Sequence, residues 1–335
     1  MPSLRRHILL LALLLLGATG TAWCDTGAPG RPQRAHKGHH RIGPKRPVLP
    51  RILFHPDSTA TVIPFNRVGN LMLVQATADT IEGNFIFDTG AAQVLLNSTY
   101  FRDYPATLVD LEGAGATGST GALQRITLGN LRLGDLEYRR QDADLGNLGH
   151  LENTKGVRIL GLLGMSLFRD CELLIDYEHN LLYIHRVRRR ESVLYTSQTL
   201  SAAPSYVEFP IELKENFILL NTEIGGKKLQ FVMDSGAESS VLDSRLPNSI
   251  FAQVQINRRV LLNGAGARKT EAFYGTLAQM KVGSQQLSAL PVLISSLEHT
   301  CFADMSCING ILSFDAFAPR RMGFNFVTRK MYLWK

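Results

Sequence analysis

The stretch NFIFDTGA at residues 84–91 occurs a second time in this 335-residue chain, as QFVMDSGA at residues 230–237. In both copies three apolar residues precede the Asp, and Gly and Ala follow it at the same spacing. A single Asp-Thr-Gly is an ordinary turn sequence and carries little information. The repetition extends further, because a shift of 146 residues also aligns residues 71–74 with 217–220, and a shift of 149 aligns residues 159–163 with 308–312 and continues to the C-terminus. The chain therefore contains an internal duplication.

The duplication predicts two homologous lobes, at residues 59–190 and 207–335, joined by a connector at residues 191–206. Its period is far too long for a solenoid, whose repeats are about 20–50 residues long. Short apolar runs between Gly and Asn turns predict β-strands in both lobes, and Gly225-Gly226 between two such runs predicts a hairpin. We also expect a short helix after each repeat of the apolar-Gly segment, around residues 165–169 and 314–317.

Each repeated loop offers a carboxyl, a hydroxyl and a glycine, namely Asp88, Thr89 and Gly90 in the first lobe and Asp234, Ser235 and Gly236 in the second. The glycines permit a tight turn that a Cβ would obstruct. The hydroxyls can hydrogen-bond across the interface between the lobes. Two carboxyls brought together by pseudo-twofold symmetry cannot both ionise easily, so they share a proton and titrate as a pair. One group can then accept a proton while the other donates one, which suits activation of water for attack on a carbonyl.

On these motifs the chain resembles the retropepsin-like aspartic proteases, with two lobes in one polypeptide. The resemblance covers both repeats, residues 59–335. It implies an all-β fold of two homologous closed β-barrel lobes related by pseudo-twofold symmetry, with the active site between them. It also implies that Asp88 and Asp234 hold a water that hydrolyses a peptide bond, in a peptide or protein substrate bound in extended conformation. Gly161 and Gly310 match the glycine of the segment that packs behind each active loop.

The candidate flaps, which would close over the substrate, are Gly-rich and lack the tyrosine of pepsin-like flaps; they contain Gly113, Gly115, Gly264 and Gly266. Ala91 and Ala237 follow the active-loop glycines, as in retropepsins, where pepsin-like enzymes carry a hydroxyl residue. Without that donor the carboxyl pair should be more basic, so we expect a mildly acidic activity optimum. Ser313 stands where the first lobe has Gly164, so the two packing segments are not equivalent.

Other functions have less support in the sequence. A peptide-binding protein without catalysis, on the same duplicated fold, is the main alternative, although loss of one Asp would be its expected signature and both are present. Glycoside hydrolases also use paired carboxyls, but the chain has two tryptophans, one of them at the end of the N-terminal apolar segment. We find neither a His-Glu-x-x-His metal motif nor a Gly-x-Ser-x-Gly nucleophile elbow.

The N-terminal region carries most of the positive charge. The chain has 36 Lys and Arg against 29 Asp and Glu, a formal net charge of +7, yet nine cations and one acid lie before residue 52. The lobes are therefore nearly neutral, which argues against nucleic-acid binding. Arg5 and Arg6 precede the apolar run at residues 8–16, and small residues follow, so residues 1–24 are predicted to be a signal peptide. Residues 25–58 are basic and rich in Pro, Gly and His, and are predicted to be a flexible segment, with a removable pro-segment as the alternative.

This pattern predicts an exported protein, periplasmic or secreted, without a membrane span. In an oxidising compartment Cys301 and Cys307 could form a disulfide, while two free thiols are the alternative. Nothing in the sequence indicates a cofactor or a metal. Because both carboxyls come from one chain, dimerisation is not needed to complete the pair, and we expect a monomer.

Overall fold

The computed structural model describes residues 6–9, 15–16, 60–115, 118–187, 206–263, 270–298, 300–302, 304, 306–317 and 320–334. The predicted flexible segment at residues 25–58 and the connector at residues 191–205 lie outside the described residues. Tyr206, which we expected to be the last connector residue, already belongs to a strand. Among the described residues, no helix has the length and apolar character needed to cross a membrane.

The first lobe is a closed barrel, in which β4 (Leu71–Ala78) pairs with both β5 (Ile81–Phe87) and β8 (Gly118–Leu133). The ring continues from β5 through β10 (Gly161–Leu163), β6 (Val94–Asn97) and β9 (Leu136–Gly146) back to β8. β7 (Thr107–Gly115) extends the sheet beyond β8. Two short helices, α1 (Ser98–Phe101) and α2 (Gly149–Lys155), and one 3₁₀ turn, η1 (Met165–Leu167), complete the described part of the lobe.

The second lobe repeats this barrel strand for strand. β15 (Phe217–Ile224), β16 (Lys227–Asp234), β21 (Gly310–Ser313), β17 (Ser240–Asp243), β20 (Gln285–Ser295) and β19 (Thr270–Val282) form a ring that closes from β19 to β15. β18 (Val254–Asn263) corresponds to β7, α4 (Asn248–Phe251) to α1, and η2 (Phe314–Ala316) to η1. Gly225 and Gly226, both at positive φ, form the expected hairpin turn between β15 and β16. The two expected helices after the apolar-Gly segments are single 3₁₀ turns.

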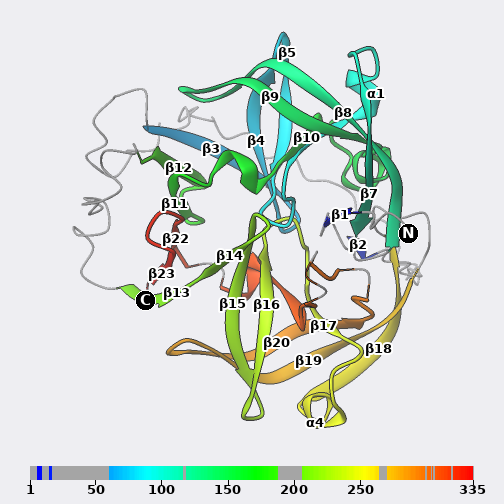
Figure 1. The fold of residues 1–335 in the computed structure, drawn as a ribbon. Helices are drawn as coiled ribbons and strands as arrows, with labels where there is room; N and C mark the ends of the chain where they lie inside the picture. Colours follow the sequence, from blue (N-terminus) through cyan, green and yellow to red (C-terminus); the bar gives the residue numbers. More distant parts are fainter. Residues whose placement is uncertain are drawn as a thin grey trace, which may run out of the picture.

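A third sheet joins the lobes, and the sequence did not predict it. Its strands run in the order β3 (Ala60–Val68), β12 (Leu181–Arg186), β11 (Cys171–Asp176), β22 (Met322–Asn325), β23 (Lys330–Trp334) and β13 (Tyr206–Pro210). β11 of the first lobe pairs antiparallel with β22 of the second at the centre of this sheet. In the first lobe β3 runs on into the barrel, whereas in the second the same path is divided between β13 and β14 (Glu212–Lys214). In Figure 1 this sheet lies on one side of the molecule, and β7 and β18 lie on the other.

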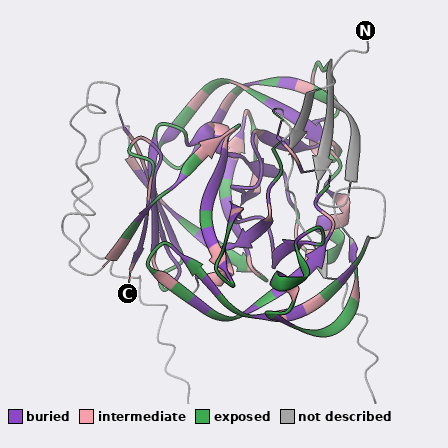
Figure 2. Ribbon diagram, turned by 60° about the horizontal axis from the view of Figure 1, so that its bottom comes forward, coloured by how far each residue is buried: buried purple, intermediate pink, exposed green. Residues whose placement is uncertain are grey.

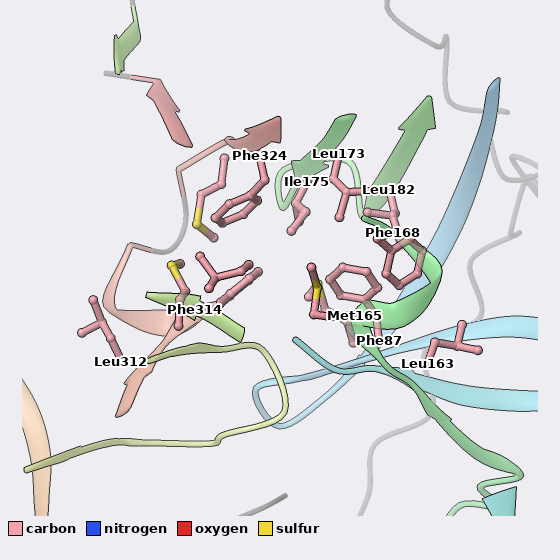
Figure 3. Close-up of a cluster of buried hydrophobic side chains, with 14 of the residues drawn as sticks. Phe87, Leu163, Met165, Phe168, Leu173, Ile175, Leu182, Leu312, Phe314 and Phe324 are labelled. Carbon is pink, nitrogen blue, oxygen red and sulfur yellow. The ribbon is translucent and has the colours of Figure 1, made fainter. Parts of the chain in front are cut away.

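The interior is apolar and continuous between the two lobes. Figure 2 shows buried residues concentrated on the inner strands, with exposed residues along the outer turns. Figure 3 shows where the halves meet: Phe87, Met165 and Phe168 of the first lobe face Leu312, Phe314 and Phe324 of the second, with Leu173, Ile175 and Leu182 of the joining sheet above them. These side chains belong to one buried cluster. The two halves are therefore packed as one core beneath the loops that carry Asp88 and Asp234.

Two short strands lie within the predicted signal peptide, and the structure describes their backbone. β1 (Arg6–Leu9) pairs parallel with β7, and β2 (Leu15–Leu16) pairs antiparallel with β18. Each lies on the outer edge of a strand that has no other partner on that side in the described sheets. Removal of residues 1–24 as a signal peptide stays a prediction.

Candidate active site

Two pseudo-symmetric strands place the carboxyls. β5 ends one residue before Asp88, and Asp234 is the last residue of β16. β10 lies parallel to β5 and antiparallel to β6, and β21 lies in the same way between β16 and β17. Gly161 and Gly310 are in these inserted strands, where a Cβ would overlap the carbonyl oxygen of Leu95 or Val241 and the ring of the neighbouring Phe. The glycines of the apolar-Gly segments thus allow the strands to pack directly behind the two loops.

The loop hydroxyls bind across the interface in a reciprocal arrangement. The amide of Thr89 donates to Oγ of Ser235 at 3.0 Å, and the amide of Ser235 donates to Oγ1 of Thr89 at 3.0 Å. Each hydroxyl then donates to a carbonyl of the opposite lobe, Thr89 to Met233 at 2.9 Å and Ser235 to Phe87 at 2.8 Å. Four buried hydrogen bonds therefore hold the two loops at a fixed spacing, as the sequence predicted for these hydroxyls.

The carboxyls converge at this interface. Oδ1 of Asp88 accepts from the amide of Gly90 at 2.8 Å, and Oδ1 of Asp234 accepts from the amide of Gly236 at 2.7 Å. Each glycine also faces the opposite carboxyl: a Cβ on Gly236 would lie 2.5 Å from Oδ1 of Asp88, and one on Gly90 would overlap the carboxyl group of Asp234. Only glycine leaves room for the two acids to approach each other here.

Burial determines the electrostatics of the pair. Burial raises the pKa of Asp88 to about 6, although the amide of Gly90 and a hydrogen bond with Asp234 act in the opposite direction. Burial also raises the pKa of Asp234 well above its ordinary value, and the negative charge of Asp88 raises it further. Two neighbouring buried carboxyls cannot both ionise without a large cost. The pair therefore holds one proton over a pH interval that begins near 6.

One oxygen of each carboxyl is left without a donor from the surrounding protein. Oδ2 of Asp88 and Oδ2 of Asp234 are buried and accept no hydrogen bond from a described group outside the pair. Ala91 and Ala237, which follow the loop glycines, are buried and have no hydroxyl to donate to them. Buried polar atoms are nearly always hydrogen-bonded. Two such oxygens in one buried pair suit the binding of a water, with one proton shared by the pair.

A family model described as aspartyl protease matches the chain twice, at residues 74–167 and 220–316. The chain belongs to the aspartyl protease family. The matches run from β4 to η1 in the first lobe and from β15 to η2 in the second, so each covers one barrel of this retropepsin-like protein. No curated protein matches the chain. Among solved structures, the crystal structure of a retropepsin-like aspartic protease from Rickettsia conorii matches with 22% sequence identity, a TM-score of 0.27, and coverage of 37% of this chain and 87% of that one.

The sequence analysis missed a second pair of contacts that hold the loops of this member of the aspartyl protease family. Nδ2 of Asn216 donates to the carbonyl oxygen of Ala92 at 3.0 Å, and Nδ2 of Asn70 donates to that of Glu238 at 2.8 Å. Each Asn lies in the turn before the first barrel strand of its own lobe. Its partner is the residue two positions after the loop glycine of the opposite lobe. Asn70 and Asn216 are separated by the same 146 residues as the two Asp. The repeat therefore contained the signal that could have identified them.

Glu238 has a further partner without a counterpart in the first lobe. Nζ of Lys155, the last residue of α2, forms an ion pair with Oε1 of Glu238, and both side chains are mostly buried. The matching position in the first lobe is Ala92. In the second lobe the region that corresponds to α2 contains a disulfide between Cys301 and Cys307. The ion pair from the first lobe to the loop of the second is therefore one-sided, because Ala92 cannot form its equivalent.

The candidate flaps are described in part. Gly113 and Gly115 are in β7, opposite Gly121 and Gly118 of β8, so this segment is a β-hairpin. Gly264 and Gly266 lie outside the described residues, beyond the end of β18. β18 and β19 form the hairpin of the second lobe. Both lobes thus contribute a hairpin on the side opposite the joining sheet (Figure 1).

Three other polar features do not belong to this site. A cavity of about 720 Å³ is lined by residues of both lobes, among them Arg169, Glu215 and Arg329, but by neither catalytic candidate. Burial raises the pKa of the Cys171 thiol to about 12, which leaves it unreactive. Ligand atoms of Asp176, Glu178 and His179 come within 4.8 Å of one another. However, Oδ2 of Asp176 accepts from Arg321 at 2.5 Å, and this cation neutralises the carboxylate that a metal ion would need.

Proposed function

We propose that this protein is an aspartic endopeptidase in which Asp88 and Asp234 activate a water for hydrolysis of a peptide bond. The observation that carries the proposal is the pair of buried carboxyls with raised pKa values, each with one oxygen that accepts no hydrogen bond from outside the pair. A buried carboxyl pair with no catalytic use would be a considerable cost to the fold. Family membership supports a protease fold, and the presence of both Asp argues against the alternative of an inactive peptide-binding protein.

The geometry supports a general acid–base mechanism. With one proton on the pair, the ionised carboxyl takes a proton from the bound water as the water oxygen bonds to the carbonyl carbon. The protonated carboxyl donates its proton to the carbonyl oxygen, which would otherwise carry a full negative charge. The carboxyl that took the water proton then gives it to the amide nitrogen, and the C–N bond breaks as the other carboxyl takes a proton from one hydroxyl of the tetrahedral intermediate. The products are an amine and a carboxylic acid, and the pair again holds one proton. Neither a metal ion nor a covalent intermediate is needed for this sequence.

The edges of β7 and β18 support an extended substrate. Both strands already pair along their outer edges with extended segments of this chain, β1 and β2. Main-chain pairing at a sheet edge provides affinity with little dependence on sequence. We infer that a peptide lies along these edges with its scissile bond at the carboxyl pair. The N-terminal sequence pattern supports export of the enzyme. Because both carboxyls come from one chain, we also propose that the enzyme is a monomer.

Cleavage of a mixed peptide library across about pH 3 to 8, the range in which such a pair can titrate, tests the proposal. The wild type is compared with Asp88→Asn and Asp234→Asn, all shown to be folded by circular dichroism. We expect cleavage by the wild type and none above background by either variant. Loss in only one variant would mean that a single carboxyl carries the chemistry. A folded wild type that cuts nothing, with and without residues 1–58, would leave the peptide-binding alternative.

A further inference from the structure

One buried position that is charged in the first lobe is apolar in the second. In the first lobe Arg125 of β8 and Asp144 of β9 are direct cross-strand neighbours, and Nε of Arg125 donates to Oδ1 of Asp144 at 2.8 Å. The side chain of Asp144 is 3% exposed, whereas that of Arg125 is 30% exposed. A buried carboxylate therefore anchors a guanidinium that reaches solvent.

Strand register places this ion pair on the sheet face that also carries the residues flanking Asp88. Asp144 lies beside Leu95 of the parallel strand β6, so their side chains share one face of the sheet. Leu95 packs in a cluster with Ile86 and Ala91, the residues two before and three after Asp88. The chain neighbours of Asp144, Ala143 and Leu145, have their side chains on the other face and pack in the barrel interior. Asp144 and Arg125 therefore face the same side as the apolar residues that flank Asp88.

The second lobe has an apolar pair in the same place. Leu293 of β20 lies beside Val241 of β17, and Tyr274 of β19 is the cross-strand neighbour of Leu293. Leu293 therefore occupies the position of Asp144, Val241 that of Leu95, and Tyr274 that of Arg125. Leu293 and Val241 are in a cluster with Ala237, which follows the second loop, and Tyr274 packs against it. The barrel thus accepts Tyr and Leu here, and the charges of the first lobe are not required by the fold.

We propose that Arg125 determines substrate specificity on the first-lobe side of the site, where it binds a side chain that ends in an accepting oxygen, Glu or Gln, while the second lobe accepts an apolar side chain at the matching place. This inference rests on the proposed function. A guanidinium carries five N–H donors in a planar fork, and the bond to Asp144 uses the one on Nε. The buried Asp144 holds the fork in position, so little side-chain entropy is lost when a substrate oxygen binds.

The sharpest test copies the second lobe into the first. The double variant Arg125→Tyr/Asp144→Leu removes both charges together and leaves neither unpaired, and both new residues already fill the matching positions of the other barrel. A matched control, Glu137→Gln/Arg139→Gln, removes an exposed ion pair from β9. We expect the wild type and the control to prefer Glu or Gln over Leu at one substrate position by about tenfold or more, the strength of a charge-assisted hydrogen bond. The double variant should lose this preference and favour apolar residues there, with other positions unchanged. Identical profiles for all three proteins would overturn the inference.

A binding measurement separates this inference from the proposed function. Asp88→Asn protein, with and without the Arg125→Tyr/Asp144→Leu substitutions, is immobilised and used to select peptides from the same library. Selection of Glu- or Gln-containing peptides only when Arg125 and Asp144 are present supports the inference even if the wild type cuts nothing. In that case the endopeptidase proposal alone fails. If the wild type cuts no peptide and the Asp88→Asn protein selects none, both proposals are wrong.

Discussion

Single residues set the proton affinity of the carboxyl pair, and this affinity affects stability. A carboxyl whose pKa is raised on folding binds its proton more tightly in the folded state, so it stabilises the fold at pH below about 4 and loses that effect as the pH rises through its folded pKa. For Asp88 this loss occurs between pH 3.8 and about 6, and for Asp234 it extends to higher pH. At neutral pH the pair is therefore a cost to the folded protein.

Replacement of Asp234 by Asn should remove that cost. Asn has the same shape but cannot ionise, so we expect Asp234→Asn to stabilise the protein at pH 7 and to change its stability little at pH 4. Urea unfolding at both pH values measures the effect. Asp103→Asn, which alters an exposed acid, serves as the control. A variant with the same pH dependence as the wild type would show that the pair is not destabilising.

The two alanines after the loop glycines should set the acid limb of the activity profile. Because one oxygen of each carboxyl accepts no hydrogen bond from outside the pair, the singly protonated pair binds its second proton near pH 6 as the pH falls. A hydroxyl placed beside each carboxylate would favour the ionised form. We therefore expect Ala91→Ser/Ala237→Ser to move the acid limb of kcat/KM to lower pH by about one unit. The pH profile of kcat/KM for one cleaved peptide measures this, and an unchanged acid limb would contradict it.

At the scale of elements, the loops are held from the opposite lobe. The turn before β4 contacts the loop after Asp234 through Asn70, and α2 contacts it through Lys155. Lys155→Met would leave Glu238 mostly buried without its cation, so we expect a loss of about 2 kcal/mol or more. Lys155→Met/Glu238→Ala removes both charges and restores the residue found in the first lobe, and it should recover most of the loss. Urea unfolding of the three proteins tests this, and equal destabilisation by both variants would contradict it.

The sequence predicted those elements whose residues repeat. The two loops, the inserted strands with Gly161 and Gly310, and the hairpin at Gly225 follow from local pattern and duplication. The joining sheet does not, because β11 and β22 are apolar segments separated by about 150 residues, and nothing local pairs them. Asp144 was missed for the opposite reason: a charged residue in a strand is ordinarily interpreted as exposed. Its burial depends on Arg125 in a neighbouring strand, which only the register reveals.

At the scale of the whole molecule, the lobes are joined by polar pairs as well as by the core. At the central strand pair Asn325 donates to Glu172 at 2.7 Å, and Arg321, just before β22, donates to Asp176 at 2.5 Å. Glu172 corresponds to Arg321 and Asp176 to Asn325 under the 149-residue shift, so the two pairs are related by the pseudo-twofold symmetry. In both pairs the first lobe supplies the carboxylate that accepts, and the second lobe supplies the donor at the symmetry-related position. This arrangement fixes how the barrels meet and hence where the carboxyls converge.

The Asp176–Arg321 pair should therefore be visible in the acid unfolding of the whole protein. Burial alone would raise the pKa of Asp176, but hydrogen bonds from His179 and the charge of Arg321 outweigh it and hold the pKa below its ordinary value. Such a group stabilises the fold above about pH 4, and the effect is lost as the pH falls through the lowered pKa. We expect Arg321→Met to cost about 2 kcal/mol or more at pH 7, with a smaller loss at pH 3, because Asp176 without this cation can take up a proton instead of remaining a buried charge. Thermal unfolding at both values, with Arg139→Gln as an exposed control, measures the difference. An equal loss at pH 3 and pH 7 would mean that Arg321 acts through packing alone.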